Sequence, residues 1–148
     1  MYKRQTKDRD SIHLSEIKRK EYTLVLRYST QCCSTCVEDI LRKMRKFEEQ
    51  YPDIDILLFT TYRVQIEKKD FQRICRFFPK VYNVFSLGIP LDEEVVPYLF
   101  VLDRGMRVID TFIPDKDLPK LTNRYFERIT TTLSRNKAYN YKYYKKEI

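Results

Sequence analysis

The sequence has little glycine, histidine or cysteine, and it has no long apolar run. Among its 148 residues are two glycines, one histidine, four cysteines and no tryptophan. Few glycines beside 43% hydrophobic residues indicate a globular chain, neither fibrous nor disordered. No apolar stretch reaches the roughly 18 residues of a transmembrane helix, and the basic N-terminus lacks the apolar core of a signal peptide. Four cysteines do not make a disulfide-dense scaffold.

Length and charge predict one domain with basic ends. A chain of 148 residues is the usual size of a single domain. The formal net charge is +8, of which residues 1–20 and residues 135–148 each carry +4. Basic ends are more often solvated tails than binding surfaces. We therefore expect a disordered N-terminus over residues 1–10 and a basic tail rich in tyrosine and lysine over residues 135–148. The ends could contact an anionic membrane surface, and nucleic acid is not favoured as a partner.

Apolar periodicity predicts strands that alternate with helices. Strands are expected at residues 22–28, 53–61 and 81–86, and amphipathic helices at residues 33–49 and 71–78. Residues 97–112 indicate two strands joined by a tight turn, with Gly105 at a positive φ. A last helix should run to about Leu133, with an irregular tail beyond it. This order predicts an α/β fold with a mixed central β-sheet and helices on both faces.

Three of the four cysteines lie together where the first predicted strand is followed by a helix. At a helix N-terminus, the helix dipole and unpaired N–H groups stabilise a thiolate, and a second cysteine three residues on lies within bonding range. Cys33 and Cys36 have this spacing, so we expect Cys33 to attack a disulfide and Cys36 to resolve the mixed disulfide. Cys32 with Cys36 is the less favoured pair, because Cys32 would lie outside the helix N-terminus. Cys32 is interpreted as a spectator or auxiliary thiol.

Zinc is a less favoured interpretation of the clustered cysteines, and the fourth cysteine is expected to have a structural place. Structural zinc generally needs four ligands in two spaced pairs, whereas the chain has no second C-x-x-C and only His13 far from the cysteines. We therefore expect no metal and no cofactor. Cys75 shares the apolar face of its predicted helix with Phe71, Ile74 and Phe78, so it is expected to be a buried, inert thiol.

Two segments of the sequence resemble the thioredoxin-like superfamily. The stretch YTLVLRYSTQCCSTC is similar to its strand, loop and active-site helix, and VVPYLFVLDRGMRVI is similar to its cis-proline loop and hairpin. The lead-in IHLSEIKRKEYTLVL, the acidic Asp39 and the turn FVLDRG are most similar to the TlpA/ResA-type thiol-disulfide oxidoreductases. The resemblance spans residues 12–133 and implies a thioredoxin-like domain over residues 11–134.

The resemblance also implies roles for three further residues. Pro97 matches the cis-proline that faces the active-site cysteines, and X-Pro is the common cis linkage in proteins. Val96 matches the residue whose backbone pairs with a bound substrate polypeptide. Asp39 matches an acidic residue that assists proton transfer at the resolving cysteine. An ordinary ion pair between Asp39 and Lys43 explains the same residue and is the favoured interpretation.

The chain departs from the family pattern around the cysteines. Cys32 stands where the family usually has tryptophan, and Arg27 stands where thioredoxin has a buried acid. If Arg27 points toward the site it would stabilise a thiolate, and otherwise it would extend to solvent. The dipeptide between the cysteines is Ser34-Thr35. Because this dipeptide influences the redox potential, we do not infer the direction of electron flow.

These observations predict a thiol-disulfide oxidoreductase that acts on protein disulfides. The expected partners are polypeptides that carry a disulfide or a dithiol. The alternative is a non-catalytic thioredoxin-like module that binds a polypeptide near Val96 and Pro97. The resemblance argues for the cell envelope or periplasm if a leader was removed, and otherwise we expect a cytoplasmic protein.

Overall fold

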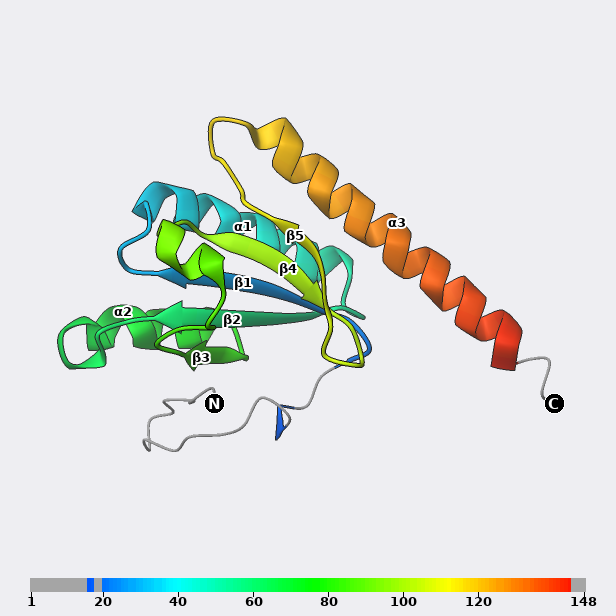
Figure 1. The fold of residues 1–148 in the computed structure, drawn as a ribbon, viewed down its shortest axis with the longest axis horizontal. Coiled ribbons are helices and arrows are strands. Elements are labelled where there is room, and N and C mark those ends of the chain that lie inside the picture. The colour runs from blue at the N-terminus through cyan, green and yellow to red at the C-terminus, as the bar shows by residue number, and fades with distance from the viewer. Residues whose placement is uncertain (1–15, 18–19, 145–148) are drawn as a thin grey trace.

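A computed structural model describes residues 16–17 and 20–144, with side chains described as far as Arg135 (Figure 1). The expected disordered segment 1–10 and His13 lie outside the described residues. The strands are β1 (Thr23–Ser29), β2 (Asp55–Thr61), β3 (Val81–Asn83), β4 (Tyr98–Leu102) and β5 (Val108–Phe112). The helices are α1 (Ser34–Gln50), α2 (Val64–Phe77), α3 (Pro119–Tyr144) and the short 3-10 helix η2 (Pro90–Glu94).

The five strands form one mixed sheet in the order β3-β2-β1-β4-β5. β2 is parallel to both β1 and β3, and β4 is antiparallel to β1 and β5. The contiguous apolar residues Leu24, Val25 and Leu26 of β1 are fully buried, as expected for a central strand that is covered on both faces. The mixed central sheet predicted from the sequence is therefore confirmed.

The helices cover the two faces of the sheet unequally. All three α-helices share one apolar core with Leu24 and Leu26 of the sheet, and α1 lies between the other two. On one side Phe47 of α1 packs against Phe126 of α3, with ring centroids 5.1 Å apart. On the other side Arg45 of α1 donates a 2.8 Å hydrogen bond to the carbonyl of Phe77 at the end of α2. The opposite face is covered in part by η2 (Figure 1), so helices flank the mixed sheet as expected, with all three α-helices on one face.

Two sequence expectations about local structure are wrong. α3 continues to Tyr144 instead of ending near Leu133, and its last part extends beyond the sheet in Figure 1. No glycine or proline follows Leu133 to stop the helix, and adding residues to an existing helix needs no new nucleation.

The positive φ of the β4–β5 turn falls at Met106 (φ 65°) and not at Gly105. The Asp103 carboxylate accepts the backbone N–H of Arg107 at 2.9 Å, which closes a longer turn than the sequence suggests. Within the described part of the chain, no helix combines the length and apolar character needed to cross a membrane.

Candidate functional site

The candidate site lies at the edge of the sheet where β1 ends and α1 begins, here called the cysteine edge (left in Figure 1). The parallel strands β1, β2 and β3 all end at this edge, β4 begins there and β5 returns to it. Two backbone hydrogen bonds hold the loop before the cysteines. Thr30 donates to the carbonyl of Thr61 at 3.2 Å, and Cys32 donates to the carbonyl of Ser29 at 3.1 Å.

Cys33 and Cys36 are joined by a hydrogen bond at the start of α1. Cys33 is the exposed N-cap residue, and no acidic side chain in the first turn offsets the positive potential of the helix N-terminus. The Cys36 thiol donates to the Cys33 sulfur, and the Thr35 hydroxyl lies 3.2 Å from the same sulfur. These hydrogen bonds lower the pKa of Cys33 to about 7, while the donated proton raises the pKa of Cys36. The pair therefore has one ready nucleophile and one protonated partner.

The remaining cysteines differ from each other in exposure. Cys32 is only 7% exposed and packs in the apolar core, where its sulfur accepts the backbone N–H of Ser29 at 3.5 Å. Cys75 is exposed, so the expectation of a buried thiol is wrong. Phe71 and Ile74 occupy the buried face of α2, and the position after Ile74 is rotated by about 100° away from that face.

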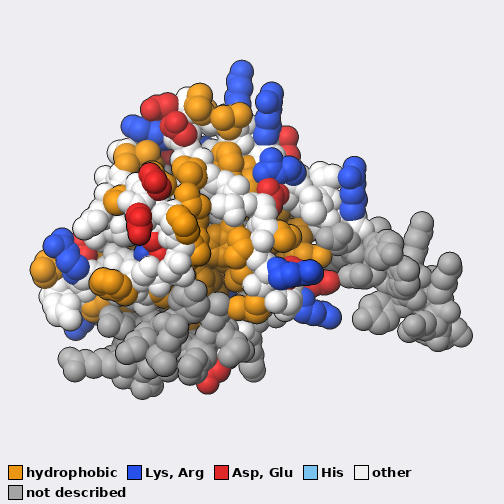
Figure 2. Space-filling view, viewed as in Figure 1, with side chains coloured by type: hydrophobic (Ala, Val, Ile, Leu, Met, Phe, Trp, Pro, Cys, Tyr) orange, Lys and Arg blue, Asp and Glu red, His pale blue; other side chains and the backbone are white. Residues whose placement is uncertain are grey.

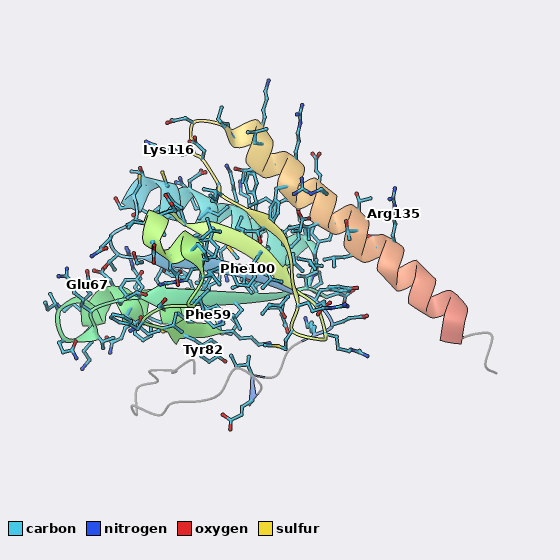
Figure 3. All side chains as sticks on the ribbon, viewed as in Figure 1. Phe59, Glu67, Tyr82, Phe100, Lys116 and Arg135 are labelled. Atoms are coloured by element: carbon cyan, nitrogen blue, oxygen red, sulfur yellow. The ribbon has the colours of Figure 1, made fainter. Side chains whose placement is uncertain are left out.

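Two charged residues that the sequence analysis did not single out lie beside the cysteine loop. The backbone N–H of Lys116, between β5 and α3, donates to the Cys36 sulfur, and its ammonium group favours the thiolate at both Cys33 and Cys36. Glu67 of α2 accepts hydrogen bonds from the backbone of Arg63, at 2.7 Å, and from the Thr30 side chain. Figure 3 labels Lys116 and Glu67 on the side where α1 begins. No local motif marks either residue.

Arg27 adopts neither of the two orientations considered from the sequence. It is only 5% exposed, so it does not extend to solvent. Its neighbours Leu26 and Tyr28 face the α-helices, and alternation along β1 directs Arg27 to the opposite face of the sheet. There its Nε lies 3.1 Å from Oδ1 of Asp92 in η2. A charged residue inside a buried strand needs a partner of opposite charge. Arg27 within the apolar run of β1 was therefore a sequence signal for an acidic partner elsewhere in the chain.

The residues assigned through the family resemblance lie on α1 and directly before β4. Asp39 forms a 2.9 Å ion pair with Lys43, so the ion-pair interpretation is confirmed, and a role in proton transfer stays a prediction. Val96 and the buried Pro97 lie immediately before β4, at the cysteine edge. No peptide bond in the described residues is cis, so the expected cis linkage before Pro97 is wrong. The trans form is the more stable one even for X-Pro bonds.

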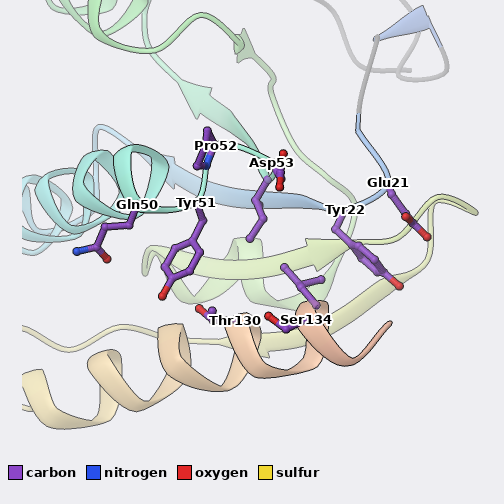
Figure 4. Close-up of a pocket in the computed structure, with 10 residues that line it drawn as sticks. Glu21, Tyr22, Gln50, Tyr51, Pro52, Asp53, Thr130 and Ser134 are labelled. Atoms are coloured by element: carbon purple, nitrogen blue, oxygen red, sulfur yellow. The ribbon is translucent and has the colours of Figure 1, made fainter. Parts of the chain in front are cut away.

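A cavity of about 230 Å³ lies at the opposite edge of the sheet, where α1 ends and β1 begins (Figure 4). Tyr22 and Tyr51 form part of its wall, with Thr130 and Leu133 of α3. This cavity is therefore separate from the cysteines. Within the described part of the chain, no three His, Cys, Asp or Glu side chains converge as metal ligands would.

The thiolate of Cys33 provides a direct test of the site. Because only the thiolate reacts with iodoacetamide, the alkylation rate of Cys33 should rise about tenfold per pH unit below its pKa and level off above it. We expect the midpoint at about pH 7. Thr35→Val removes a hydroxyl that stabilises the thiolate and should move the midpoint upward. Thr131→Val, on the exposed side of α3, should leave it unchanged. A wild-type midpoint near the ordinary value of about 8.5 would contradict this electrostatic account.

Comparisons with known proteins find solved structures that resemble this chain in fold but share little of its sequence. No protein-family model and no curated protein matches the sequence. A proposed thiol-disulfide oxidoreductase from Bacteroides vulgatus is similar in structure, with a TM-score of 0.57, 15% identity, and coverage of 88% of this chain and 87% of that one. A thiol peroxidase from Chromobacterium violaceum also has a TM-score of 0.57, with 12% identity and coverage of 88% and 80%.

A proposed thioredoxin from Neisseria meningitidis is similar as well, with a TM-score of 0.55, 15% identity, and coverage of 88% of this chain and 86% of that one. The placement in the TlpA/ResA branch stays a prediction. At such low identities a structural likeness establishes the fold alone. The chain therefore has the thioredoxin-like fold.

Proposed function

We propose that this protein is a thiol-disulfide oxidoreductase that acts on protein disulfides through Cys33 and Cys36. The observation that carries the proposal is the hydrogen bond between these two thiols at the start of α1, which lowers the pKa of Cys33 and raises that of Cys36. Cys33 is exposed and has a pKa of about 7, so a large share of it is thiolate at neutral pH. A nucleophile of this kind, with a second thiol within hydrogen-bonding distance, is what disulfide exchange requires.

The exchange proceeds in two balanced steps. The Cys33 thiolate attacks one sulfur of the substrate disulfide, the substrate S–S bond breaks, and the departing sulfur leaves as a thiolate that takes up a proton. Cys36 then loses its proton and attacks the Cys33 sulfur, which releases the second substrate thiol. Two electrons pass to the substrate, and the protein is left with a Cys33–Cys36 disulfide. The same steps in reverse would oxidise a substrate dithiol. Lys116 supports the second step, because its N–H and its positive charge both stabilise the Cys36 thiolate.

The surface around the cysteines supports a polypeptide as the substrate. Six exposed apolar side chains lie on elements that end or begin at the cysteine edge, or in the connecting segments next to those ends: Ile66, Phe85, Val95, Ile113, Leu118 and Leu121. Figure 2 shows apolar side chains at the left and upper margins of the molecule as well as over the middle of this face. Exposed apolar side chains grouped around one site are typical of a surface that binds another protein.

A non-catalytic binding module is the alternative, and the exposed Cys33 with its lowered pKa argues against it. A module that only binds polypeptides needs neither an exposed thiol nor a lowered pKa at Cys33. In the enzyme both features have a use, because the thiolate is the reacting species. The buried Cys32 in place of the family's tryptophan is compatible with either function.

The proposal is tested by measuring how many insulin disulfides the wild-type protein reduces and which of its cysteines become oxidised. The reduced protein, mixed with insulin and no other reductant, should reduce about one insulin disulfide per chain and then stop. Peptide mass spectrometry should find the lost thiols as a disulfide between Cys33 and Cys36. Protein whose cysteines were alkylated beforehand is the control and should reduce none. The oxidised protein mixed with reduced insulin tests the reverse direction. Absence of exchange in both directions, or a disulfide that joins a different pair of cysteines, would contradict the proposal.

A further inference from the structure

The segment before β4 is attached to the sheet by one largely buried carboxylate, that of Asp92. Asp92 accepts four hydrogen bonds: its Oδ1 from the Arg27 guanidinium at 3.1 Å and the Tyr98 hydroxyl at 2.8 Å, and its Oδ2 from the Leu87 N–H at 2.6 Å and the Ser86 hydroxyl at 3.0 Å. Burial disfavours the ionised form, but the hydrogen bonds outweigh it and hold the pKa of Asp92 below its usual range. A carboxylate with this many donors is held in a single position.

Arg27 connects this carboxylate to the two central strands. Its Nη1 donates to the carbonyl of Tyr28 in β1 at 2.7 Å and lies 3.5 Å from the carbonyl of Phe59 in β2. The side chains of Arg27 and Asp92 are 6% and 10% exposed, so solvent screens their attraction only weakly. The pair therefore fixes η2 to the strand that leads directly to the cysteines.

Tyr98 closes the segment from its other end. The Tyr98 ring is fully buried at the start of β4, and its hydroxyl reaches back six residues to Asp92. The chain between them turns through Val95, which adopts a left-handed conformation at φ 52° and ψ 41°. This conformation is strained for a β-branched residue and persists only where surrounding contacts enforce it. The contacts of Asp92 on one side and Tyr98 on the other supply that constraint.

The held segment adjoins the candidate site. Tyr98 pairs with Arg27 in the antiparallel register of β4 and β1, so Val96 lies two residues nearer to the cysteine edge. Val96 is the residue whose backbone is expected to pair with a substrate polypeptide. Its placement therefore depends on the same contacts that hold Val95.

We propose that Arg27, Asp92 and Tyr98 are positioning residues that hold the segment 92–98 in the conformation that binds a substrate polypeptide beside Cys33. The inference rests on the proposed function, because it assigns the segment to substrate binding. The inference predicts different behaviour for polypeptide disulfides and for small disulfides. A polypeptide needs the segment, whereas a small disulfide needs only the exposed Cys33 thiolate and Cys36.

The test replaces the charged pair with apolar side chains of similar size. A buried ion pair replaced in this way often costs little stability, so Arg27→Met/Asp92→Leu should still unfold cooperatively in a thermal scan. We expect KM for insulin to rise about tenfold with little change in kcat. The rate with 2-hydroxyethyl disulfide should stay within about twofold of wild type. Hydrogen exchange at the Leu87 amide should become about tenfold faster or more.

Two further variants keep the test decisive. Tyr98→Phe deletes one hydroxyl and leaves the ring in the core, so it should fold and raise KM for insulin about twofold to threefold. Arg107→Met breaks the 2.8 Å ion pair with Asp103 at the opposite edge and should leave KM unchanged. An unchanged KM in the folded double variant and in Tyr98→Phe would overturn the inference, as would an equal loss with both substrates. If the wild type reacts with neither insulin nor 2-hydroxyethyl disulfide, the proposed function fails. If hydrogen exchange at the Leu87 amide is the same in the double variant as in the wild type, only the proposal that these residues hold the segment is contradicted.

Discussion

Replacing Cys36 with serine should stop turnover and leave Cys33 covalently bound to its substrate. The serine hydroxyl can still donate a hydrogen bond to the Cys33 sulfur, so the thiolate that starts the reaction should persist. The hydroxyl cannot attack the mixed disulfide at neutral pH, because it stays protonated far above the pKa range of a thiol. The reaction therefore halts after its first step, and the adduct should approach one substrate per chain.

The adduct can be measured directly. Cys36→Ser is mixed with insulin, the exchange is quenched with acid, and the products are resolved by non-reducing electrophoresis and intact mass. We expect the rate of insulin reduction to fall about 100-fold or more, and the added mass to disappear with dithiothreitol. The matched control is Cys75→Ser, which removes an exposed thiol on α2 and should reduce insulin at the wild-type rate. An adduct that maps to Cys75, or undiminished turnover in Cys36→Ser, would contradict the assignment of the pair.

The fold was predictable because its strongest signals are local. The contiguous apolar residues of β1 and the helical spacing of Val37, Ile40, Leu41 and Met44 on α1 identify those elements without knowledge of their neighbours. The C-x-x-C spacing then places Cys33 and Cys36 at the start of a helix, and the structure brings their thiols together. The alternation of strands and helices predicted the parallel pairs of the sheet, and the hairpin predicted the antiparallel ones.

The electrostatics of the site were not predictable in the same way. Arg27 and Asp92 are 65 residues apart in the sequence, and only the pairing of β1 with β4 brings η2 over β1. Lys116 reaches Cys36 through its backbone N–H, a group that every residue except proline carries, so its identity gave no signal. The length of α3 was missed for another reason. Its last residues lack an apolar period, and periodicity detects a helix only where one face is buried.

The second large effect distinguishes Cys33 from Cys32 as the attacking thiol. Cys33→Ser should lose measurable reduction of insulin, because the exposed thiolate with a pKa of about 7 is removed. Cys32→Ala should keep turnover within about threefold of wild type and lose about 1 kcal/mol of unfolding free energy, since it deletes one buried sulfur from the core. Cys33→Ser should therefore lose activity and Cys32→Ala should lose stability, because the two adjacent residues differ in exposure.

Both variants are compared in the insulin assay and in urea unfolding. Cys33→Ser should unfold at nearly the wild-type midpoint, because its side chain lies on the surface and serine is accepted at a helix N-cap. Its inactivity would then reflect lost chemistry and not lost structure. If Cys33→Ser kept its activity while Cys32→Ala lost it with the fold intact, the working pair would be Cys32 and Cys36. The buried Cys32 would then have to leave the core during each reaction cycle, and hydrogen exchange at Ser29, whose N–H it accepts, would report that opening.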